Sequence, residues 1–269
     1  MTSIATFNAP PYGRSGASLA VVKSGTDEKI TRRLRAQYRW LKRFSHNEGI
    51  VGVYREVTYP SPHEYGYEME LLTPIPMHKR SLLSDLEPYV SEVLPTLHAV
   101  WQCGNLGTSR MCEWHPICEW PEGGPDLHGW WYQIVRDYGR PDECETHGDP
   151  TMENVLLRGK RRVLVDPLPD VTSDGRAPSC RALDMGKVLQ SLIGYERIRW
   201  MGDEPTYPDA VLVHKLRERC TRDCDWHLAC WACLFHVRRL IPYQEHMMQF
   251  AWLKWLPRIE EMMRELAQL

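Results

Sequence analysis

The sequence predicts an α+β fold in two parts, a small strand-rich part over residues 1–72 and a mostly helical part over residues 73–269. Three patterns lead to this prediction. In the first part, short apolar runs separated by turn residues surround one helical pattern. In the second part, apolar residues recur three and four positions apart over long stretches. A single hairpin pattern at residues 154–165 interrupts these helical stretches. The chain is long enough for one large core or two modest ones.

The strand-rich part begins with an apolar run at residues 18–23, which predicts a strand. The turn residues that follow offer Thr26 or Asp27 as the N-cap of a helix that ends near residue 44. Two further strands are predicted at residues 50–57 and 65–72. A proline-rich turn separates them, so the predicted order is strand, helix, strand, strand.

The helical part begins after an abrupt change in pattern at residue 73. Helices are predicted at residues 82–100, 129–138, 182–193, 210–219, 226–240 and 244–269. Residues 103–126 are rich in Gly, Pro, Trp and Cys, which predicts an irregular loop. Pro257 is expected to kink or break the last helix, because proline lacks an amide hydrogen and crowds the preceding turn.

The composition narrows the possible functions. The formal net charge of -2 gives no general attraction to nucleic acid or to an anionic membrane, so neither partner is expected. Residues 1–11 lack the basic start and apolar run of a secretory signal. No uncharged apolar run reaches the ~18 residues of a membrane span. The nine cysteines follow no disulfide-scaffold spacing, which favours free thiols and a cytoplasmic location.

The sharpest local pattern is HGDPTMEN, which begins at His147, followed by VLVD, which ends at Asp166. Phosphoryl transfer from a nucleotide needs a carboxylate that orients the acceptor hydroxyl and takes its proton, together with oxygen ligands for Mg²⁺. Asp149 suits the first role, as the catalytic base. Asn154 and Asp166 suit the second role, because they flank the two strands of the predicted hairpin. His147 is better suited to bracing this loop by hydrogen bonding than to acting as a base.

These motifs resemble the catalytic and metal-binding loops of the aminoglycoside phosphotransferase and choline kinase superfamily, relatives of the protein kinases. The segment LDMGKVLQSL at residues 183–192 is similar to the helix that follows the metal-binding aspartate in that family. The resemblance implies a bilobal protein-kinase-like fold, with an N-lobe over residues 1–72 and a C-lobe over residues 73–269. Asp184 would tie down the backbone of the catalytic loop.

The same resemblance implies the reactants. ATP or GTP would be the phosphoryl donor, Mg²⁺ the cofactor, and the hydroxyl group of a small molecule the acceptor. A sugar, an amino alcohol or an aminoglycoside-like molecule would fit that class.

A second stretch of the resemblance implies nucleotide-binding residues. The strand AVVK resembles the family's third strand, whose lysine contacts the α and β phosphates, and here that residue is Lys23. The glutamate that pairs with this lysine in the family aligns with Gln37, which can hydrogen bond an ammonium group without opposing its charge. Glu28 is an alternative partner. Gly13 and Gly16 are the candidates for a phosphate-binding glycine loop. The residues that read the nucleotide base would be Met69, Glu70, Leu71 and Leu72.

Four alternatives compete with this interpretation. Taken alone, residues 147–166 are an ordinary turn-rich loop around a hairpin, since Asp, Asn, Gly and Pro are common in turns. The poor glycine loop and Gln37 also suit a pseudokinase that serves as a nucleotide-binding or regulatory module. A protein kinase is a third alternative, although no Pro-Glu anchor occurs between Asp166 and Asp184.

The fourth alternative is a metalloprotein built on the cysteine-rich row Cys220, Cys224, His227, Cys230 and Cys233. Zinc favours such ligands, but structural zinc sites usually take them from two turns. The intervals of this row are helical, which favours buried free thiols on one helix face.

Overall fold

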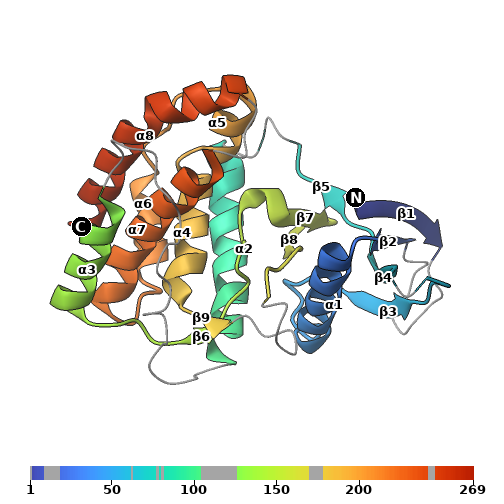
Figure 1. Cartoon of the computed structure of the whole chain (residues 1–269). Coiled ribbons are helices and arrows are strands. Elements are labelled where there is room, and N and C mark those ends of the chain that lie inside the picture. Colours follow the sequence, from blue (N-terminus) through green and yellow to red (C-terminus); the bar gives the residue numbers. More distant parts are fainter. Residues whose placement is uncertain are drawn as a thin grey trace.

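The computed structural model describes residues 2–8, 19–61, 63–76, 79, 82–103, 126–169, 178–241 and 246–269. Over these residues the chain has small antiparallel sheets and a mostly helical remainder, so the predicted α+β class is confirmed. A four-stranded sheet with helix α1 (Glu28–Arg43) lies on one side of the molecule, and most of the helices lie on the other. The hairpin of β7 (Val155–Arg158) and β8 (Arg161–Leu164) lies between them (Figure 1).

The four-stranded sheet is antiparallel, with the strand order β1-β2-β4-β3. Its strands are β1 (Thr2–Asn8), β2 (Leu19–Gly25), β3 (Val53–Val57) and β4 (Tyr65–Glu70). The sequence analysis did not predict β1. The predicted strand at residues 50–57 is shorter in the structure, because Ile50 forms an isolated parallel bridge to Leu164 of β8 instead of joining the sheet.

Helix α1 covers the sheet and packs against β2, β3 and β4. Asp27 caps it as predicted, since its side chain accepts hydrogen bonds from the amides of Lys29 at 2.9 Å and Ile30 at 3.2 Å. The helix buries Leu34, Trp40 and Leu41, which follow helical spacing. This face carries Trp40 toward the carbonyl of Thr146 and Gln37 toward the carbonyl of Pro167.

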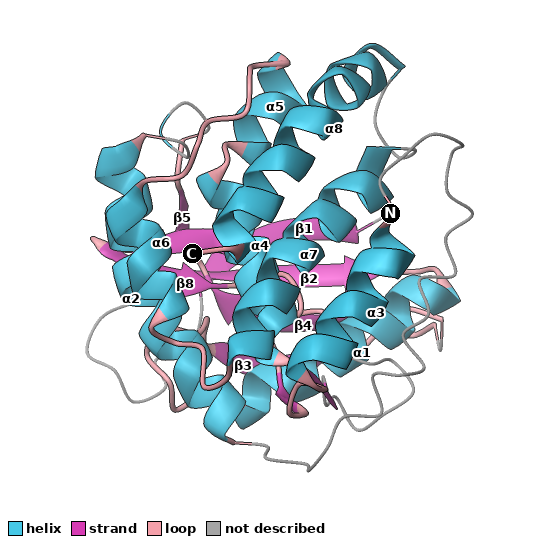
Figure 2. Cartoon of the chain, turned by 90° about the vertical axis from the view of Figure 1, so that its left-hand side faces the viewer, coloured by secondary structure: helices cyan, strands magenta, loops and turns pink. Residues whose placement is uncertain are grey.

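The remaining elements follow β4 in the chain. They are β5 (Thr73–Pro74), α2 (Leu83–Gln102), α3 (Leu127–Tyr138), β6 (Cys144–Glu145), η3 (Met152–Asn154), β9 (Pro178–Ser179), α4 (Arg181–Leu192), α5 (Tyr195–Met201), α6 (Ala210–Arg217), α7 (Asp223–Leu240) and α8 (His246–Ala267). Figure 2 views these helices from their own side, with the strands behind them. Helix α4 packs along α7, and α7 also contacts α3 and α8.

Two features of the helical part differ from the sequence-based expectations. Helix α5 was not predicted. Helix α8 continues through Pro257, so of the two expected effects, a kink or a break, the break does not occur. The apolar side chains on both sides of this proline, Trp252, Leu256 and Ile259, are buried, and their burial offsets the hydrogen bond that proline removes. Among the described residues, no helix has the length and apolarity that crossing a membrane requires.

Buried apolar side chains of the described residues form two clusters. One comprises the sheet, α1 and parts of α2 and the hairpin, and the other comprises the helices from α2 onward. Strand β8 contributes to both clusters, because successive side chains of a strand point to opposite faces. Val163 belongs to the first cluster, whereas Leu164 belongs to the second. The hairpin is thus the shared wall between the two clusters.

Candidate active site

The loop from Thr146 to Asn154 is anchored from below by Asp184 of α4. The carboxylate of Asp184 accepts hydrogen bonds from the amides of His147 at 3.0 Å and Gly148 at 2.8 Å, and from the indole of Trp101 at 2.9 Å. Burial raises the pKa of Asp184 to about 6, although these three hydrogen bonds favour its charged form. The structure therefore confirms that Asp184 ties down the loop backbone.

Gly148 is required by the shape of this loop. Its φ of 83° lies in the left-handed region, which favours glycine. A β-carbon at this position would lie 2.9 Å from the β-carbon of Leu168 and 3.0 Å from its carbonyl oxygen. The close approach brings the loop against the turn that follows Asp166, where the Leu168 amide donates to the His147 carbonyl at 2.8 Å.

Asp149 lies on this loop with both carboxylate oxygens engaged. The side-chain amide of Asn154 donates to Oδ2 at 2.8 Å and to the Asp149 backbone carbonyl at 2.9 Å. The ammonium group of Lys187 lies 3.1 Å from Oδ1. The Asp149 side chain is 26% exposed, so it remains within reach of a bound molecule.

Asp166 follows β8 in a strained conformation. Its φ of 56° makes it the single non-glycine residue with positive φ among the residues that the structure describes. Its carboxylate forms an ion pair with Lys23 of β2. Lys23 also donates to Oε1 of Gln37 at 3.3 Å, and Nε2 of Gln37 donates to the Pro167 carbonyl at 2.9 Å. Gln37 thereby links the lysine to the turn that carries Asp166.

The backbone joins this turn to the loop from Thr146 to Asn154, because the Val165 amide donates to the Asn154 carbonyl at 2.9 Å. The structure thus brings together five of the residues singled out in the sequence. The strand-rich part supplies Lys23 and Gln37. The loop and the hairpin region supply Asp149, Asn154 and Asp166.

His147 is fully buried beneath the loop. Its ring packs edge-on against Trp40 with the centroids 5.4 Å apart, and its Nδ1 accepts a 3.4 Å hydrogen bond from the Asp149 amide. Burial lowers the pKa of His147 to about 4, against the opposite effect of the negative charges of Asp149 and Asp166. A neutral, enclosed imidazole is suited to supporting the loop, which agrees with the expectation for this residue.

The predicted base-reading segment lies at the end of β4. Met69 and Leu72 are buried, whereas Leu71 is exposed. The side chain of Glu70 binds Arg158 of β7 through hydrogen bonds of 2.6 and 2.5 Å. The carboxylate of Glu70 is therefore already engaged by Arg158.

Two other expectations fare differently. Glu28 does not replace Gln37 as the partner of Lys23, because it lies in the exposed first turn of α1 and pairs with Arg32 at 2.5 Å. That alternative is therefore wrong. Gly13 and Gly16 lie outside the described residues.

Much of the cysteine row lies on α7, as its helical intervals predict. Cys224, Cys230 and Cys233 are buried there as free thiols. Burial, assisted by the nearby charge of Asp225, raises the pKa of Cys224 to about 11. Within the described ranges, no three His, Cys, Asp or Glu side chains are grouped as metal ligands.

The sequence analysis missed two contributors to this region. Lys187 was a visible signal, since it is a lysine in an otherwise apolar stretch of α4, one turn after Asp184. The indole of Trp40 donates to the Thr146 carbonyl at 3.1 Å and holds α1 against the loop. No local pattern marks Trp40 for this contact, because its partner lies far away in the sequence.

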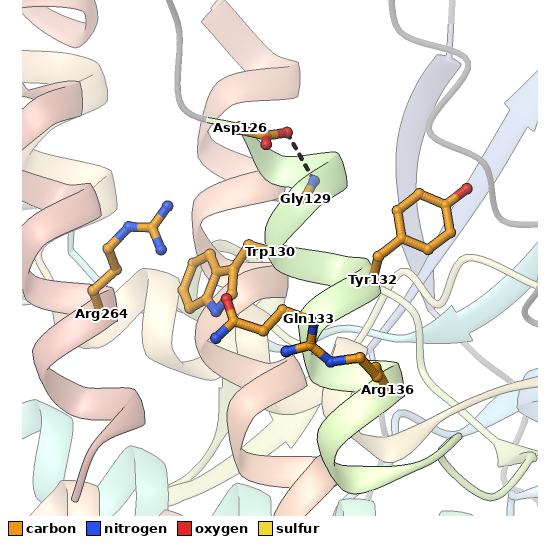
Figure 3. A pocket seen from close by; sticks show the side chains of 7 residues that line it. All are labelled: Asp126, Gly129, Trp130, Tyr132, Gln133, Arg136 and Arg264. Carbon is orange, nitrogen blue, oxygen red and sulfur yellow. Dashed lines mark hydrogen bonds between the residues drawn. The ribbon is translucent and has the colours of Figure 1, made fainter.

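A surface hollow of about 690 Å³ opens elsewhere, between α3 and α8. Figure 3 shows its lining side chains, with Arg264 of α8 facing Trp130 of α3. The guanidinium carbon of Arg264 lies 4.7 Å from the Trp130 ring centroid. None of the residues that line this hollow belongs to the loop from Thr146 to Asn154 or to the Asp166 turn, so it is distinct from the candidate active site.

No protein-family profile and no curated protein matches the sequence. Solved structures match across nearly the whole chain. A putative fructosamine-3-kinase from Haemophilus somnus 129PT has a TM-score of 0.52 and 10% identity, covering 99% of this chain and 92% of that one. The macrolide 2'-phosphotransferase MphH from Brachybacterium faecium has a TM-score of 0.50 and 12% identity, covering 94% of this chain and 92% of that one.

A third match is the GDP and kanamycin complex of the aminoglycoside phosphotransferase APH(2")-IIia, with a TM-score of 0.50 and 10% identity. It covers 96% of this chain and 93% of that one. Their names, a fructosamine kinase, a macrolide phosphotransferase and an aminoglycoside phosphotransferase, agree with the superfamily that the sequence motifs resemble. The chain therefore has the protein-kinase-like fold of the aminoglycoside phosphotransferase superfamily.

Proposed function

We propose that the protein is a phosphotransferase that moves the γ-phosphoryl group of ATP or GTP, with Mg²⁺, to a hydroxyl group of a small molecule. A sugar, an amino alcohol or an aminoglycoside-like molecule is the acceptor class that we favour. The solved structures with this fold include a macrolide 2'-phosphotransferase, an aminoglycoside phosphotransferase with bound GDP and kanamycin, and a fructosamine kinase. These names favour a small-molecule acceptor over a protein.

One observation carries the proposal, namely the convergence of Asp149, Asn154, Asp166 and Lys23 on a single loop–hairpin unit. A turn-rich loop without function would need neither the Lys23–Asp166 ion pair nor the left-handed Asp166. Backbone strain of this kind costs of order 1–3 kcal/mol and concentrates at functional sites. The convergence therefore favours a chemical role over the structural alternative.

The donor set suits Mg²⁺. Asn154 uses its amide nitrogen for both hydrogen bonds to Asp149, and no hydrogen bond within the described part of the chain engages its Oδ1. The Asp166 carboxylate is 38% exposed. Mg²⁺ favours oxygen ligands and is usually held by one or two protein groups plus phosphates, so Asn154 and Asp166 would hold it. When bound, Mg²⁺ would neutralise charge on the nucleotide phosphates.

The proposed mechanism assigns separate tasks to the residues of the chain. Asp149 accepts a hydrogen bond from the acceptor hydroxyl, orients its oxygen for attack and takes its proton as the new oxygen–phosphorus bond forms. The bond between the γ-phosphorus and the bridging oxygen breaks, and ADP or GDP leaves with that oxygen. The ammonium group of Lys23 moves from Asp166 to the α and β phosphates of the donor. The hydrogen bond to Gln37 keeps this ammonium group in the site. His147 supports the loop from below. Positioning and charge stabilisation supply most of the rate enhancement.

We further propose that residues 1–72 and 73–269 act as two lobes with the nucleotide between them. The two buried apolar clusters support this division, because Leu72 belongs to the cluster of the sheet and Ile75 to the cluster of the helices. Met69, Glu70, Leu71 and Leu72 would then bind the nucleotide base through their backbone. The described cysteines are free thiols, which favours the cytoplasm as its location.

The first test separates an active enzyme from a pseudokinase. ATP or GTP is expected to raise the melting temperature only when Mg²⁺ is present, and acceptor hydroxyl compounds are expected to stimulate ADP or GDP release. A library of sugars, amino alcohols and aminoglycosides supplies the acceptors. A Mg²⁺-dependent thermal shift with no turnover on any acceptor would favour the pseudokinase. Phosphorylation of added protein alone would favour a protein kinase.

The second test assigns the residues. Asp149→Ala is expected to lower kcat by about 10²- to 10⁴-fold, the usual range for a general base, with Mg-nucleotide binding largely intact. Asp166→Ala is expected to abolish the Mg²⁺ dependence of the thermal shift. Asp137→Ala, which removes an exposed carboxylate from α3, is the matched control and is expected to behave like the wild type. Full activity of Asp149→Ala would overturn the assignment of the base.

A further inference from the structure

We propose that Lys187 is a positioning residue that fixes the Asp149 carboxylate for proton transfer, an inference that rests on the proposed function. Lys187 lies in α4, whose residues from Ala182 to Leu192 are all buried. Its side chain is only 4% exposed, and its ammonium nitrogen lies 3.1 Å from Oδ1 of Asp149. It therefore reaches the catalytic loop from inside the helical core.

Burying an ammonium group is unfavourable unless a partner of opposite charge compensates it. The other groups beside Lys187 cannot do so. Burial, and then the positive charge of Lys187 itself, hold the pKa of His236 well below its ordinary value, so this imidazole is neutral. The thiol of Cys233 also stays protonated, because burial raises its pKa far above neutrality. Among the described residues, Asp149 is the one anion that forms an ion pair with Lys187.

The pair fixes the carboxylate in a single orientation. Asn154 binds Oδ2 at 2.8 Å and Lys187 binds Oδ1, so rotation about the Cβ–Cγ bond would break a contact on each side. A general base must hold its oxygen within hydrogen-bond reach of the acceptor hydroxyl. Misplacement by about 1 Å can lower a rate by about 100-fold. Lys187 thus affects the chemistry through Asp149 without needing to touch the substrate.

Helix α4 supplies both halves of this support. Asp184 and Lys187 are three residues apart, a spacing that places two side chains on the same face of a helix. Asp184 binds the backbone amides of His147 and Gly148, and Lys187 binds the side chain of Asp149. One helical turn therefore sets the position of the loop and the orientation of its carboxylate.

Lys187→Met is the central variant, since methionine keeps the length and apolar character of the stem. We expect kcat to fall by about 10- to 100-fold, with the KM values for nucleotide and acceptor changed by less than about twofold. Gln190→Leu is the matched control. Gln190 is buried on the same helix, and its side-chain amide has no hydrogen-bond partner among the residues that the structure describes. It is expected to keep the wild-type kcat, which separates positioning from general disturbance of α4.

A melting-temperature cycle tests the pair without relying on turnover. Asp149→Asn leaves a buried cation unpaired and is expected to lower the melting temperature. Adding Lys187→Met to that variant removes the cation and is expected to raise the melting temperature again. Strictly additive effects would overturn the inference, and so would a Lys187→Met enzyme with unchanged kcat. If the cycle shows coupling but the wild type turns over no acceptor, the proposed function has failed, and the positioning role fails with it.

Discussion

At the scale of single residues, Gln37 makes two hydrogen bonds that a glutamate at this position could not both make. Its Oε1 accepts from Lys23, while its Nε2 donates to the Pro167 carbonyl at 2.9 Å. Both bonds are made by a side chain that is almost completely buried. A carboxylate has no hydrogen to donate, so it would leave the Pro167 carbonyl unpaired and place a negative charge beside it. The glutamine is therefore matched to this particular Asp166 turn.

Gln37→Glu is accordingly expected to destabilise the protein and to weaken, not improve, its binding of Mg-nucleotide. The new carboxylate would attract the ammonium group of Lys23, which is stabilising. Against this, the variant loses the buried hydrogen bond to the Pro167 carbonyl, and its carboxylate repels that carbonyl oxygen. We expect a net loss of about 1–2 kcal/mol in the free energy of unfolding and weaker binding of Mg-nucleotide. Chemical denaturation and nucleotide titration measure the two effects. Gln37→Met, which removes both hydrogen bonds without adding charge, is the control. A Gln37→Glu protein that is more stable and binds nucleotide more tightly would contradict this account.

His147 predicts a pH dependence of stability. Its pKa is about 4 in the folded chain and about 6.5 in the unfolded chain, so between these values only the unfolded chain binds the proton. The stabilisation from a neutral His147 is therefore complete above pH 6.5 and is lost as the pH falls to about 4. Its loss amounts to about 3 kcal/mol. His147→Gln cannot titrate and serves as the reference. Unfolding of both proteins by urea from pH 4 to pH 7.5 should show the difference in stability shrinking in acid. A constant difference would exclude this role.

At the scale of elements, the packing of α4 on α7 depends on Gly186. A β-carbon at this position would lie 2.6 Å from the β-carbon of Ala232 and 2.9 Å from the carbonyl oxygen of Ala229. Both atoms belong to α7, and one of them is backbone, so neither can move aside freely. The two helices approach this closely because one of them lacks a side chain here. The approach in turn holds α4, and with it Asp184 and Lys187, at its distance from the catalytic loop.

Gly186→Ala is expected to destabilise the protein despite the better helix propensity of alanine. Alanine gains about 1 kcal/mol over glycine within a helix. Overpacking of a close helix contact costs about 1–3 kcal/mol, and contact with the α7 backbone favours the upper end. Thermal unfolding measures the net loss, and Ala232→Gly in the same chain should recover part of it by removing the nearest atom. Equal or greater stability of Gly186→Ala would refute the close-packing argument.

The sequence predicted elements where a local signal exists. The spacing of apolar residues located α1, α2, α4, α6 and α7. The turn residues before α1 located its N-cap, which is Asp27. The apolar spacing did not locate β1 or α5. Strand β1 is defined by its pairing with β2, from Thr2 opposite Gly25 to Asn8 opposite Leu19, and such pairing leaves no local periodicity of its own.

The residues of the candidate site were likewise predictable only where a local sequence pattern marks them. The loop and hairpin residues follow from a short motif whose members lie close together in the sequence. The residues of other elements that contact this motif, such as Lys187 of α4 and Trp40 of α1, do not follow from it. The sequence of α4 has a polar row of Asp184, Lys187 and Ser191 at spacings of three and four, but every residue of α4 from Ala182 onward is buried. The row therefore does not mark a solvent-exposed face, and the sequence near it does not show which residues it contacts. The pairing of Lys187 with Asp149 depends on tertiary packing alone.

At the scale of the whole molecule, the hairpin β7–β8 unites the strand-rich and helical parts. Val163 of β8 and Val165, which directly follows β8, belong to the apolar cluster of the sheet and α1, although they lie in the helical part of the sequence. Backbone hydrogen bonds add to this junction, since the Val51 amide donates to the Leu164 carbonyl at 3.0 Å and the Leu164 amide donates to the Gly49 carbonyl at 2.8 Å. The site is therefore assembled on a surface that both parts of the chain build.

A chain restricted to residues 73–269 is for this reason expected not to fold on its own. It would expose Val100, Val163 and Val165, which are buried against the strand-rich part in the intact chain. Burial of each valine contributes about 1.5–3 kcal/mol, and together these approach the 5–15 kcal/mol by which a typical domain is stable. The fragment would also lose Trp40 from above His147. Circular dichroism during heating should show no cooperative transition for the fragment, and co-expression with residues 1–72 should restore one. Cooperative melting of the fragment alone at the temperature of the full chain would mean that the hairpin is not a shared wall but belongs to an independent domain.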